Sequence, residues 1–321
     1  MGNIKAIIIY SMMNPFNKNR RIHYGVMDKF KNLCKDCHIY TVGDDIPSLT
    51  KVNAEKIYKR HKPDVFITYD GRIKTRKHYI GDATLKNIPC KKISICNDLP
   101  DKKDRNNYTF FYKNGFDLVF QRGTFVFEDL DIPSVWLPYS ADENVFNLDI
   151  KNKNNKVGIA ATYNPKVYIQ RKKIMRILKR KKLLSLCDRP CKRYPEKYIQ
   201  FLCSLKVGVT SVETKDENFT TPKAKMFEYL ASKTAVLTPS FTGIDNLFTE
   251  EYNKYIEVFD YENLVKKAEK LLNNNEYRNK MIKNAYDLFL EQHTDQKRAE
   301  EMYLNVLNLL EGREIIKKWG R

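Results

Sequence analysis

The chain has 321 residues, with 58 Lys and Arg against 39 Asp and Glu, and its formal net charge is +19. Hydrophobic residues make up 42% and aromatic residues 12%, which is enough for packed cores and excludes a disordered chain. No apolar run approaches the ~20 residues that span a bilayer, and the first residues resemble a strand and not a signal peptide. We therefore expect a cytoplasmic protein of about two domains, located in the host cytoplasm if its source is a phage or virus.

The first half of the chain predicts strands that alternate with helices. The run Lys5–Tyr10 (KAIIIY) is typical of a buried parallel strand. Helices are predicted at Ile22–Cys34 and Ala54–Arg60. Further strands are predicted at His38–Val42, Asp64–Thr68, Lys92–Cys96, Asp117–Phe120 and Ser134–Leu137. This alternation favours βαβ units and a twisted parallel sheet.

A polar stretch rich in Lys and Asn, Asp149–Lys156, is the candidate domain boundary. After it the alternation restarts with a strand at Val157–Ala160 and a helix at Tyr168–Lys182. The remaining predicted strands are Lys206–Thr210, Thr234–Thr238 and Tyr255–Phe259, and the remaining predicted helices are Lys223–Ser232, Glu262–Asn273, Glu276–Gln292 and Thr294–Leu310. The sequence thus predicts two Rossmann-like halves, whose ligands should lie outside the carboxyl ends of the strands.

Two nucleotide-binding fingerprints are missing from the sequence. Neither half has a G-x-G-x-x-G motif, and no G-x-x-x-x-G-K-[ST] motif occurs. Their absence argues against a dehydrogenase and against a P-loop NTPase. The seven cysteines include Cys34-x2-Cys37 and Cys187-x3-Cys191, but neither pair has the compact second pair of a zinc ribbon, so we predict no metal site.

The positive charge is concentrated in one segment. Residues 151–200 contain 16 Lys and Arg against 2 Asp and Glu, and residues 166–182 contain no acid. Such a segment indicates a nearby polyanion, which is nucleic acid, anionic lipid headgroups or substrate phosphates. Its candidate contacts are Lys172, Lys173, Arg176 and Lys179. The alternative is a solvated helix face in a Lys-rich chain.

A candidate nucleotide-binding helix begins near Thr220-Thr221-Pro222, which we interpret as a capping start with Pro near the first helical turn. The positive end of the helix would then face the ligand. Lys225 and Glu228 lie three residues apart on one helix face, where they could serve phosphate and ribose hydroxyls, or form a surface ion pair.

A candidate general base lies in the first half of the chain. Asp98 follows the predicted strand Lys92–Cys96 by two residues, so we expect it at the carboxyl end of that strand. A carboxylate at that position could act as a general base that takes the proton of a substrate hydroxyl. The alternative is a turn-forming Asp before Leu99-Pro100.

Several of these segments resemble known families. Residues 225–238 resemble the nucleotide-sugar segment of GT-B glycosyltransferases, and residues 135–146 (VWLPYSADENVF) resemble their interdomain passage, especially in spore-maturation-type members. The resemblance, which covers roughly residues 90–310, implies that Glu228 binds ribose and that Arg171 holds the diphosphate, with Lys166 as a further candidate. Many members carry an earlier Glu, in a paired-glutamate motif, where this chain has Thr220. Thr220 and Thr221 are further candidate nucleotide-sugar contacts.

A narrower resemblance is to the DNA β-glucosyltransferases of T-even phages. It rests on Asn218-Phe219-Thr220-Thr221, on Lys225 three residues before Glu228, and on Ala231-Ser232. Residues 97–100 (NDLP) are similar to the segment that supplies the catalytic aspartate of those enzymes.

Together the resemblances imply a GT-B fold in the α/β class, with two Rossmann-like domains facing each other across a cleft. We expect an acceptor domain at 1–148, with 300–321 crossing back to it, and a nucleotide-sugar domain at 149–299. The implied donor is UDP-glucose or a related nucleotide sugar, with no obligatory metal. The expected acceptor is a hydroxymethylated base in double-stranded DNA. The alternatives are a cell-surface glycan, lipid or protein acceptor, binding at an anionic membrane surface, and a non-catalytic nucleic-acid-binding protein.

Overall fold

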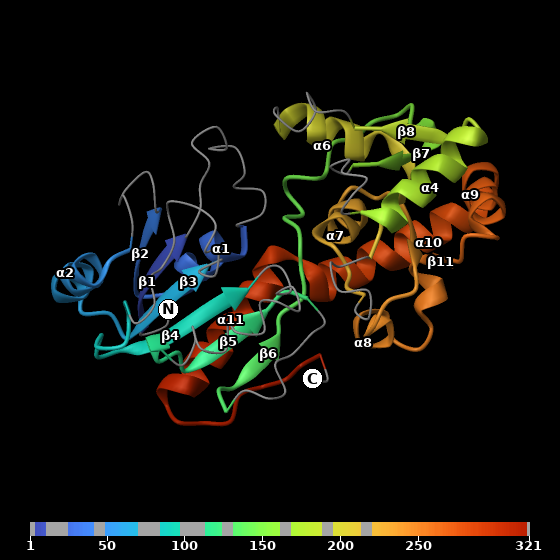
Figure 1. Ribbon diagram of the computed structural model, residues 1–321. Coiled ribbons are helices and arrows are strands. Elements are labelled where there is room, and N and C mark those ends of the chain that lie inside the picture. The colour runs from blue at the N-terminus through green and yellow to red at the C-terminus, as the bar shows by residue number, and fades with distance from the viewer. Residues whose placement is uncertain are drawn as a thin grey trace. The chain divides into compact units, whose positions relative to one another are not determined.

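The computed structural model describes residues 4–10, 25–41, 49–69, 84–96, 113–123, 131–160, 168–187, 195–212 and 220–319. The chain divides into two compact units, the N-terminal unit (Met1–Pro138 with Arg298–Arg321) and the C-terminal unit (Tyr139–Lys297) (Figure 1). The segment after Pro138 is bonded within the C-terminal unit, since Ser140 Oγ donates to Asp295 Oδ1 over 2.6 Å. The sequence-based boundary at residue 148 therefore lies inside that unit.

The N-terminal unit is built on a sheet of six parallel strands in the order β2-β1-β3-β4-β5-β6. They are β1 (Lys5–Tyr10), β2 (Asp36–Thr41), β3 (Val65–Tyr69), β4 (Lys91–Cys96), β5 (Leu118–Gln121) and β6 (Ser134–Trp136). Each begins and ends within two residues of a predicted strand. For most of them the reason is that buried parallel strands are largely apolar runs, which the sequence displays directly, while the edge strand β2 is only partly buried.

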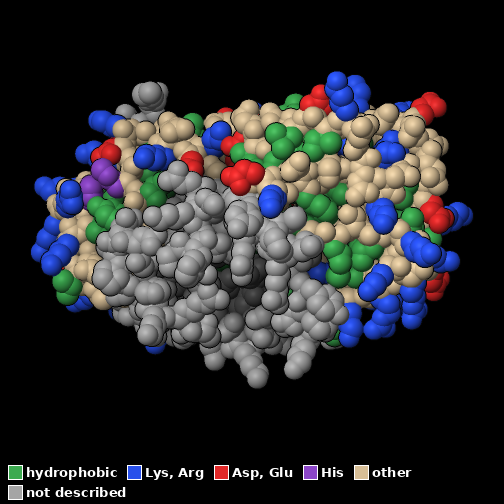
Figure 2. Space-filling view, turned by 90° about the horizontal axis from the view of Figure 1, so that it is seen from above, with side chains coloured by type: hydrophobic (Ala, Val, Ile, Leu, Met, Phe, Trp, Pro, Cys, Tyr) green, Lys and Arg blue, Asp and Glu red, His purple; other side chains and the backbone are tan. Residues whose placement is uncertain are grey.

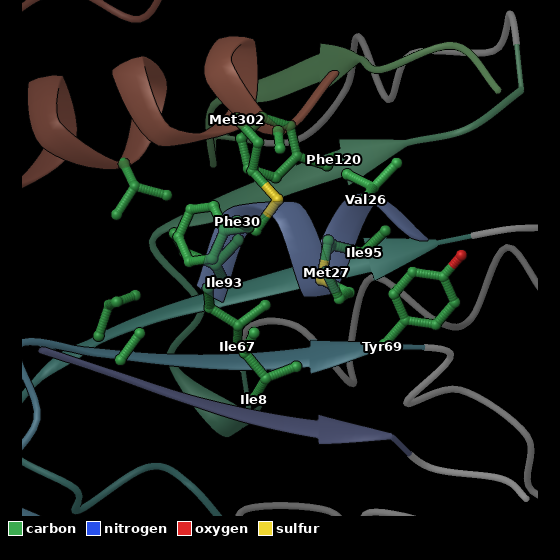
Figure 3. Close-up of a cluster of buried hydrophobic side chains, with 14 of the residues drawn as sticks. Ile8, Val26, Met27, Phe30, Ile67, Tyr69, Ile93, Ile95, Phe120 and Met302 are labelled. Atoms are coloured by element: carbon green, nitrogen blue, oxygen red, sulfur yellow. The ribbon is translucent and has the colours of Figure 1, made fainter. Parts of the chain in front are cut away.

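Helices cover both faces of this sheet. On one face lie α1 (Gly25–Leu33) and part of α11 (Asp295–Leu310), and on the other lies α2 (Lys51–His61). Figure 3 shows Ile8 and Ile67 of the sheet with Phe30 of α1 and Met302 of α11. Ile7 packs in the core with α2, since successive strand residues point to opposite faces.

The C-terminal unit contains a five-stranded parallel sheet in the order β11-β10-β9-β7-β8. Its strands are β7 (Asn154–Ile159), β8 (Leu184–Leu186), β9 (Leu205–Val209), β10 (Ala235–Pro239) and β11 (Glu257–Phe259). Strand β7 begins inside the stretch that the sequence predicted to be a polar linker. The sequence also missed β8, a three-residue edge strand with no buried residue.

Its helices are α4 (Ile169–Arg180), α6 (Pro195–Cys203), α7 (Ala224–Ala231), α8 (Ile244–Phe248), α9 (Leu264–Asn273) and α10 (Asn275–Leu288), with a 3-10 turn η4 (Tyr252–Lys254) and a π-helical turn η5 (Phe289–His293). Helices α6 and α8 were not predicted. Helices α4 and α9 share a core with β7 and β9, in which Ile174 and Leu271 are fully buried. The two parallel-sheet α/β units confirm the predicted fold class.

Helix α7 packs closely on the strands through Tyr229. Its ring is fully buried, and its hydroxyl donates to Gly158 O over 3.3 Å and accepts from the backbone N–H of Ala160 over 3.2 Å. A Cβ atom added to Gly208 would lie 2.6 Å from the Tyr229 ring. Glycine at position 208 is therefore required by the close approach of the helix.

We expect Gly208→Ala to lower the free energy of unfolding by about 1–3 kcal/mol, because overpacking forces side chains off their preferred rotamers. The ring of Tyr229 is held at its hydroxyl and cannot easily turn aside. Urea denaturation of the variant and of wild type measures the change, provided that the free energy of unfolding depends on urea concentration with the same slope in both. An unchanged midpoint would contradict the tight packing of α7 on β9.

Candidate functional site

A pocket of about 180 Å³ lies at the carboxyl ends of β7 and β9 in the C-terminal unit. This is the end of a parallel sheet at which ligands of such folds bind. The lining residues come from the two strand ends, from α4 and from the start of α7; they are Ile159, Ala160, Tyr168, Arg171, Val209, Thr210, Ser211, Lys223 and Lys225. The volume is below the roughly 300–1,000 Å³ of a drug-sized site, so the pocket fits part of a larger ligand.

Arg171 is held at the pocket by two contacts. It lies in the first turn of α4, and its Nε donates to Ser211 Oγ over 3.3 Å. Its guanidinium lies 4.0 Å from the centre of the Tyr168 ring, which favours a stacked arrangement. These contacts fix the plane of a side chain whose fork of N–H donors matches phosphate oxygens.

Lys225 is the second cation that the sequence predicted at this site. Its Nζ donates to Tyr198 Oη over 2.8 Å and lies 3.5 Å from Glu228 Oε2. The Tyr198 hydroxyl donates to the same carboxylate oxygen. Burial, followed by the negative charge of Glu228, raises the pKa of Tyr198 above its usual range. Tyr198 therefore remains protonated and holds Glu228 and Lys225 together.

Glu228 is only 2% exposed and does not line the pocket. The ion pair with Lys225 that the i,i+3 spacing allowed is present, but it is partly buried and not a surface pair. Glu228 thus acts on the pocket through Lys225. Its role in binding ribose stays a prediction.

The start of α7 differs from the predicted capping start. The helix begins at Ala224, and its N-cap is Lys223, which makes no side-chain capping bond. Thr221 is buried, and its backbone N–H donates to Val212 O over 2.9 Å. Thr220 Oγ1 accepts from the N–H of Thr242 over 3.0 Å. Because the N-cap is Lys223 and not a threonine, the capping interpretation is wrong. The roles of Thr220 and Thr221 in nucleotide-sugar binding stay predictions.

The charge of the lining is entirely positive. Arg171, Lys223 and Lys225 line the pocket, and no Asp or Glu among the described residues does. The positive end of α7 adds to this field at Lys223. The site can therefore stabilise the negative charge of a diphosphate.

Two predicted site residues, Asp98 and Lys166, lie outside the described residues. Asp98 comes two residues after the end of β4, and Lys166 lies between β7 and α4. Their roles as base and as diphosphate contact stay predictions.

The predicted polyanion contacts Lys172, Lys173, Arg176 and Lys179 all lie on α4. Lys173, Arg176 and Lys179 are exposed, while Lys173 Nζ also lies 3.7 Å from the centre of the Tyr261 ring. Within the described part of the chain, none of the four forms an ion pair with a carboxylate. Figure 2 shows Lys and Arg side chains at both ends of the view, and the right-hand end is the side on which Figure 1 draws α4 and α9. This face of the helix is open to a polyanion.

Contributors to the site that were not predicted include Tyr168, Ser211, Lys223 and Tyr198. Ser211 lies two residues beyond the end of β9, so the rule that ligands lie at carboxyl strand ends could have identified it. Tyr198 comes from α6, a helix that the sequence pattern did not reveal.

The described residues offer neither a metal cluster nor a membrane span. Across the ranges that the structure describes, no three His, Cys, Asp or Glu side chains are grouped as a metal site would need. None of the helices in these ranges is both long and apolar enough to cross a membrane.

The comparisons with known proteins agree with this geometry. Residues 171–303 match the family model described as glycosyl transferase-like. No curated protein matches the sequence.

Among solved structures, an alpha-glucosyltransferase in complex with UDP-glucose and DNA containing an abasic site is similar, with a TM-score of 0.64 at 12% identity, over 96% of this chain and 100% of that one. Anabaena HepE in complex with UDP and glucose has a TM-score of 0.63 at 8% identity, over 95% and 100%. Sucrose-phosphate synthase from Thermosynechococcus elongatus has a TM-score of 0.62 at 8% identity, over 96% and 100%.

These likenesses establish the fold, which is the GT-B fold of glycosyltransferases. Together with the family match they support a glycosyltransferase. The resemblance to spore-maturation-type enzymes is not confirmed. The similar structure that contains DNA is an alpha-glucosyltransferase, whereas the sequence suggested a resemblance to DNA β-glucosyltransferases.

Proposed function

We propose that this protein transfers the sugar of a nucleotide diphosphate sugar, UDP-glucose or a close relative, to the hydroxyl of a hydroxymethylated base in DNA. The observation that carries the donor part is the cationic pocket at the carboxyl ends of β7 and β9, with Arg171 held by Ser211 and Tyr168. Its size and charge fit the diphosphate of the donor.

In this proposal the pocket acts on the leaving group. Negative charge builds on the diphosphate as the bond between sugar and phosphate breaks, so cations fixed beforehand stabilise the transition state more than the ground state. Arg171 is fixed by its contacts, and Lys225 is fixed by Tyr198 and Glu228. Lys166 would add a third contact.

The acceptor hydroxyl must lose a proton when it attacks the sugar. We assign this proton to Asp98, whose carboxylate comes two residues after the end of β4 in the sequence. The solved alpha-glucosyltransferase bound to UDP-glucose and DNA supports a donor and acceptor of these kinds on this fold.

The proposal that the acceptor is DNA is based on the charge of helix α4. Its exposed face carries cations without carboxylate partners among the described residues, which suits a backbone of phosphates. The alternatives are a glycan, lipid or protein acceptor, or binding of these cations to an anionic membrane. Salt dependence distinguishes DNA from these alternatives.

We expect duplex affinity to fall steeply with salt, with a log–log slope of about −0.9 per phosphate contacted. Changing Lys172, Lys173, Arg176 and Lys179 to Gln should make the slope shallower by about 0.9 for each phosphate that the variant no longer binds. UDP binding should stay nearly intact, because none of the four lines the donor pocket. Filter binding from low to physiological salt, with plain and hydroxymethylated duplexes, measures the slopes.

The matched control neutralises four cations on α2, Lys51, Lys56, Lys59 and Arg60, which lowers the net charge equally. Equal slopes in both variants would mean that net charge alone drives binding. No duplex binding even at low salt would remove DNA as the acceptor and favour a glycan or lipid.

A further inference from the structure

A second pocket lies at the opposite end of the same sheet in the C-terminal unit. Its volume is about 410 Å³, and its lining includes Lys153, just before β7, and Lys206, near the start of β9. The donor pocket is lined by Ile159 and Val209, the last residues of these two strands. Since a strand rises about 3.3 Å per residue, the length of β7 separates the pockets by roughly 16 Å. A ligand of one pocket is therefore distinct from a ligand of the other.

The second pocket is strongly cationic. Lys151, Lys153, Lys206, Lys233 and Arg278 line it, against one acid, Asp149. Within the described ranges, none of the five cations has a carboxylate oxygen within ion-pair distance. The wall of the pocket thus carries an uncompensated positive charge.

Two of these cations, Lys153 and Lys206, are instead positioned by neutral acceptors. Lys153 Nζ donates to Ser232 O over 3.3 Å and to Lys233 O over 2.8 Å, and Lys206 Nζ donates to Asn155 Oδ1 over 2.9 Å. Neutral acceptors orient an ammonium group without cancelling its charge.

Arg278 is the most deeply placed of the five. It is 6% exposed, and its Nη1 donates to Leu271 O over 2.8 Å and to Leu272 O over 3.0 Å, at the end of α9. Burial lowers the pKa of the Lys153 ammonium. Among its neighbours, Cys203 and Asp149 oppose this shift, while the positive charges of Lys233 and Arg278 add to it. This mutual repulsion would be relieved by a bound anion.

The shape of the pocket suits a small ligand. Its volume lies within the roughly 300–1,000 Å³ of small-molecule sites. Leu148, Ile150 and Ile282 add apolar surface beside the cations. A duplex could reach the exposed Lys233, but its backbone is too broad to approach a side chain as buried as Arg278.

We propose that this pocket binds a small phosphate-bearing ligand at a site separate from that of the donor. The cations hold the phosphate groups, and the apolar wall accommodates a non-polar part of the same molecule. The proposed transfer reaction does not require this site. Binding of a ligand here would therefore be a second property of the protein, separate from sugar transfer.

The test uses inorganic pyrophosphate as the probe and the full chain, titrated first without UDP and then with UDP, which the proposed function places in the donor pocket. The pocket variant carries Lys206→Gln and Lys233→Gln. The control variant carries Lys266→Gln and Lys317→Gln, two exposed lysines outside the pocket with the same change in net charge. Isothermal titration calorimetry gives the affinities, and the comparison of variants isolates this pocket whether or not UDP binds.

We expect pyrophosphate affinity to fall at least about tenfold in the pocket variant, because two charge-assisted phosphate ligands are removed, and to change less than about twofold in the control. Equal decreases in both variants, or no pyrophosphate binding by wild type, would overturn the proposal. Displacement of pyrophosphate by a stoichiometric short duplex would also overturn it, and would assign the pocket to the DNA backbone.

Discussion

Asp98→Asn is expected to lower sugar transfer about 100-fold or more while donor binding survives. Asn has nearly the same shape as Asp but cannot take the proton of the acceptor hydroxyl, and loss of a general base costs about 10²–10⁴-fold. A 100-fold loss corresponds to about 2.7 kcal/mol of transition-state stabilisation. Transfer from UDP-glucose to a hydroxymethylated duplex gives the rate, and calorimetry with UDP gives the donor affinity.

The matched control for this variant is Asp101→Asn, which removes a carboxylate three residues further along the chain. Its transfer rate should stay within about twofold of wild type. Near-normal transfer by Asp98→Asn would show that Asp98 forms the turn before Leu99-Pro100. It would also favour a retaining reaction without a protein base.

The strands were the most predictable part of the fold. Strands β3, β4, β5 and β6 of the N-terminal unit are almost entirely buried, because a parallel sheet covered by helices buries both faces of its strands, whereas the edge strand β2 is only partly buried. The elements that the sequence did not predict lack such a clear apolar pattern. Strand β8 is short and has no buried residue, and α6 was not recognised between it and β9. Local sequence alone did not reveal elements that depend on the rest of the fold for their place.

The candidate site was predictable only in part for a related reason. Spacing placed Lys225 and Glu228 on one helix face, and the distance of 3.5 Å between their charged atoms confirms it. Spacing could not show that Glu228 is buried, since Tyr198 reaches it from α6, thirty residues earlier in the chain. Removing this carboxylate would leave the Tyr198 hydroxyl and the Lys225 ammonium without their common partner. Glu228→Ala would therefore disturb folding as well as binding, and it cannot test the donor pocket cleanly.

Arg171 provides a cleaner test of the donor pocket, because it is half-buried at the pocket wall and not in the core. We expect Arg171→Ala to weaken UDP binding by roughly 10- to 100-fold, the range for removing a charge-assisted hydrogen bond to phosphate. The stacking of the guanidinium on Tyr168 and its bond to Ser211 mean that Lys cannot replace it fully. Arg171→Lys should therefore give an intermediate affinity.

The matched control is Arg176→Ala, which removes the same side chain from an exposed position of the same helix. Its UDP affinity should stay within about twofold of wild type, because Arg176 does not line the pocket. Calorimetry with UDP and with UMP separates the phosphate contacts from those of the nucleoside. The decrease in Arg171→Ala should be larger for UDP than for UMP if the guanidinium holds the second phosphate. Unchanged UDP affinity in Arg171→Ala, with an unchanged urea midpoint, would show that the donor does not bind at the carboxyl ends of β7 and β9. Equal decreases in the two Arg variants would instead mean that the positive field of α4 attracts the nucleotide without a specific contact.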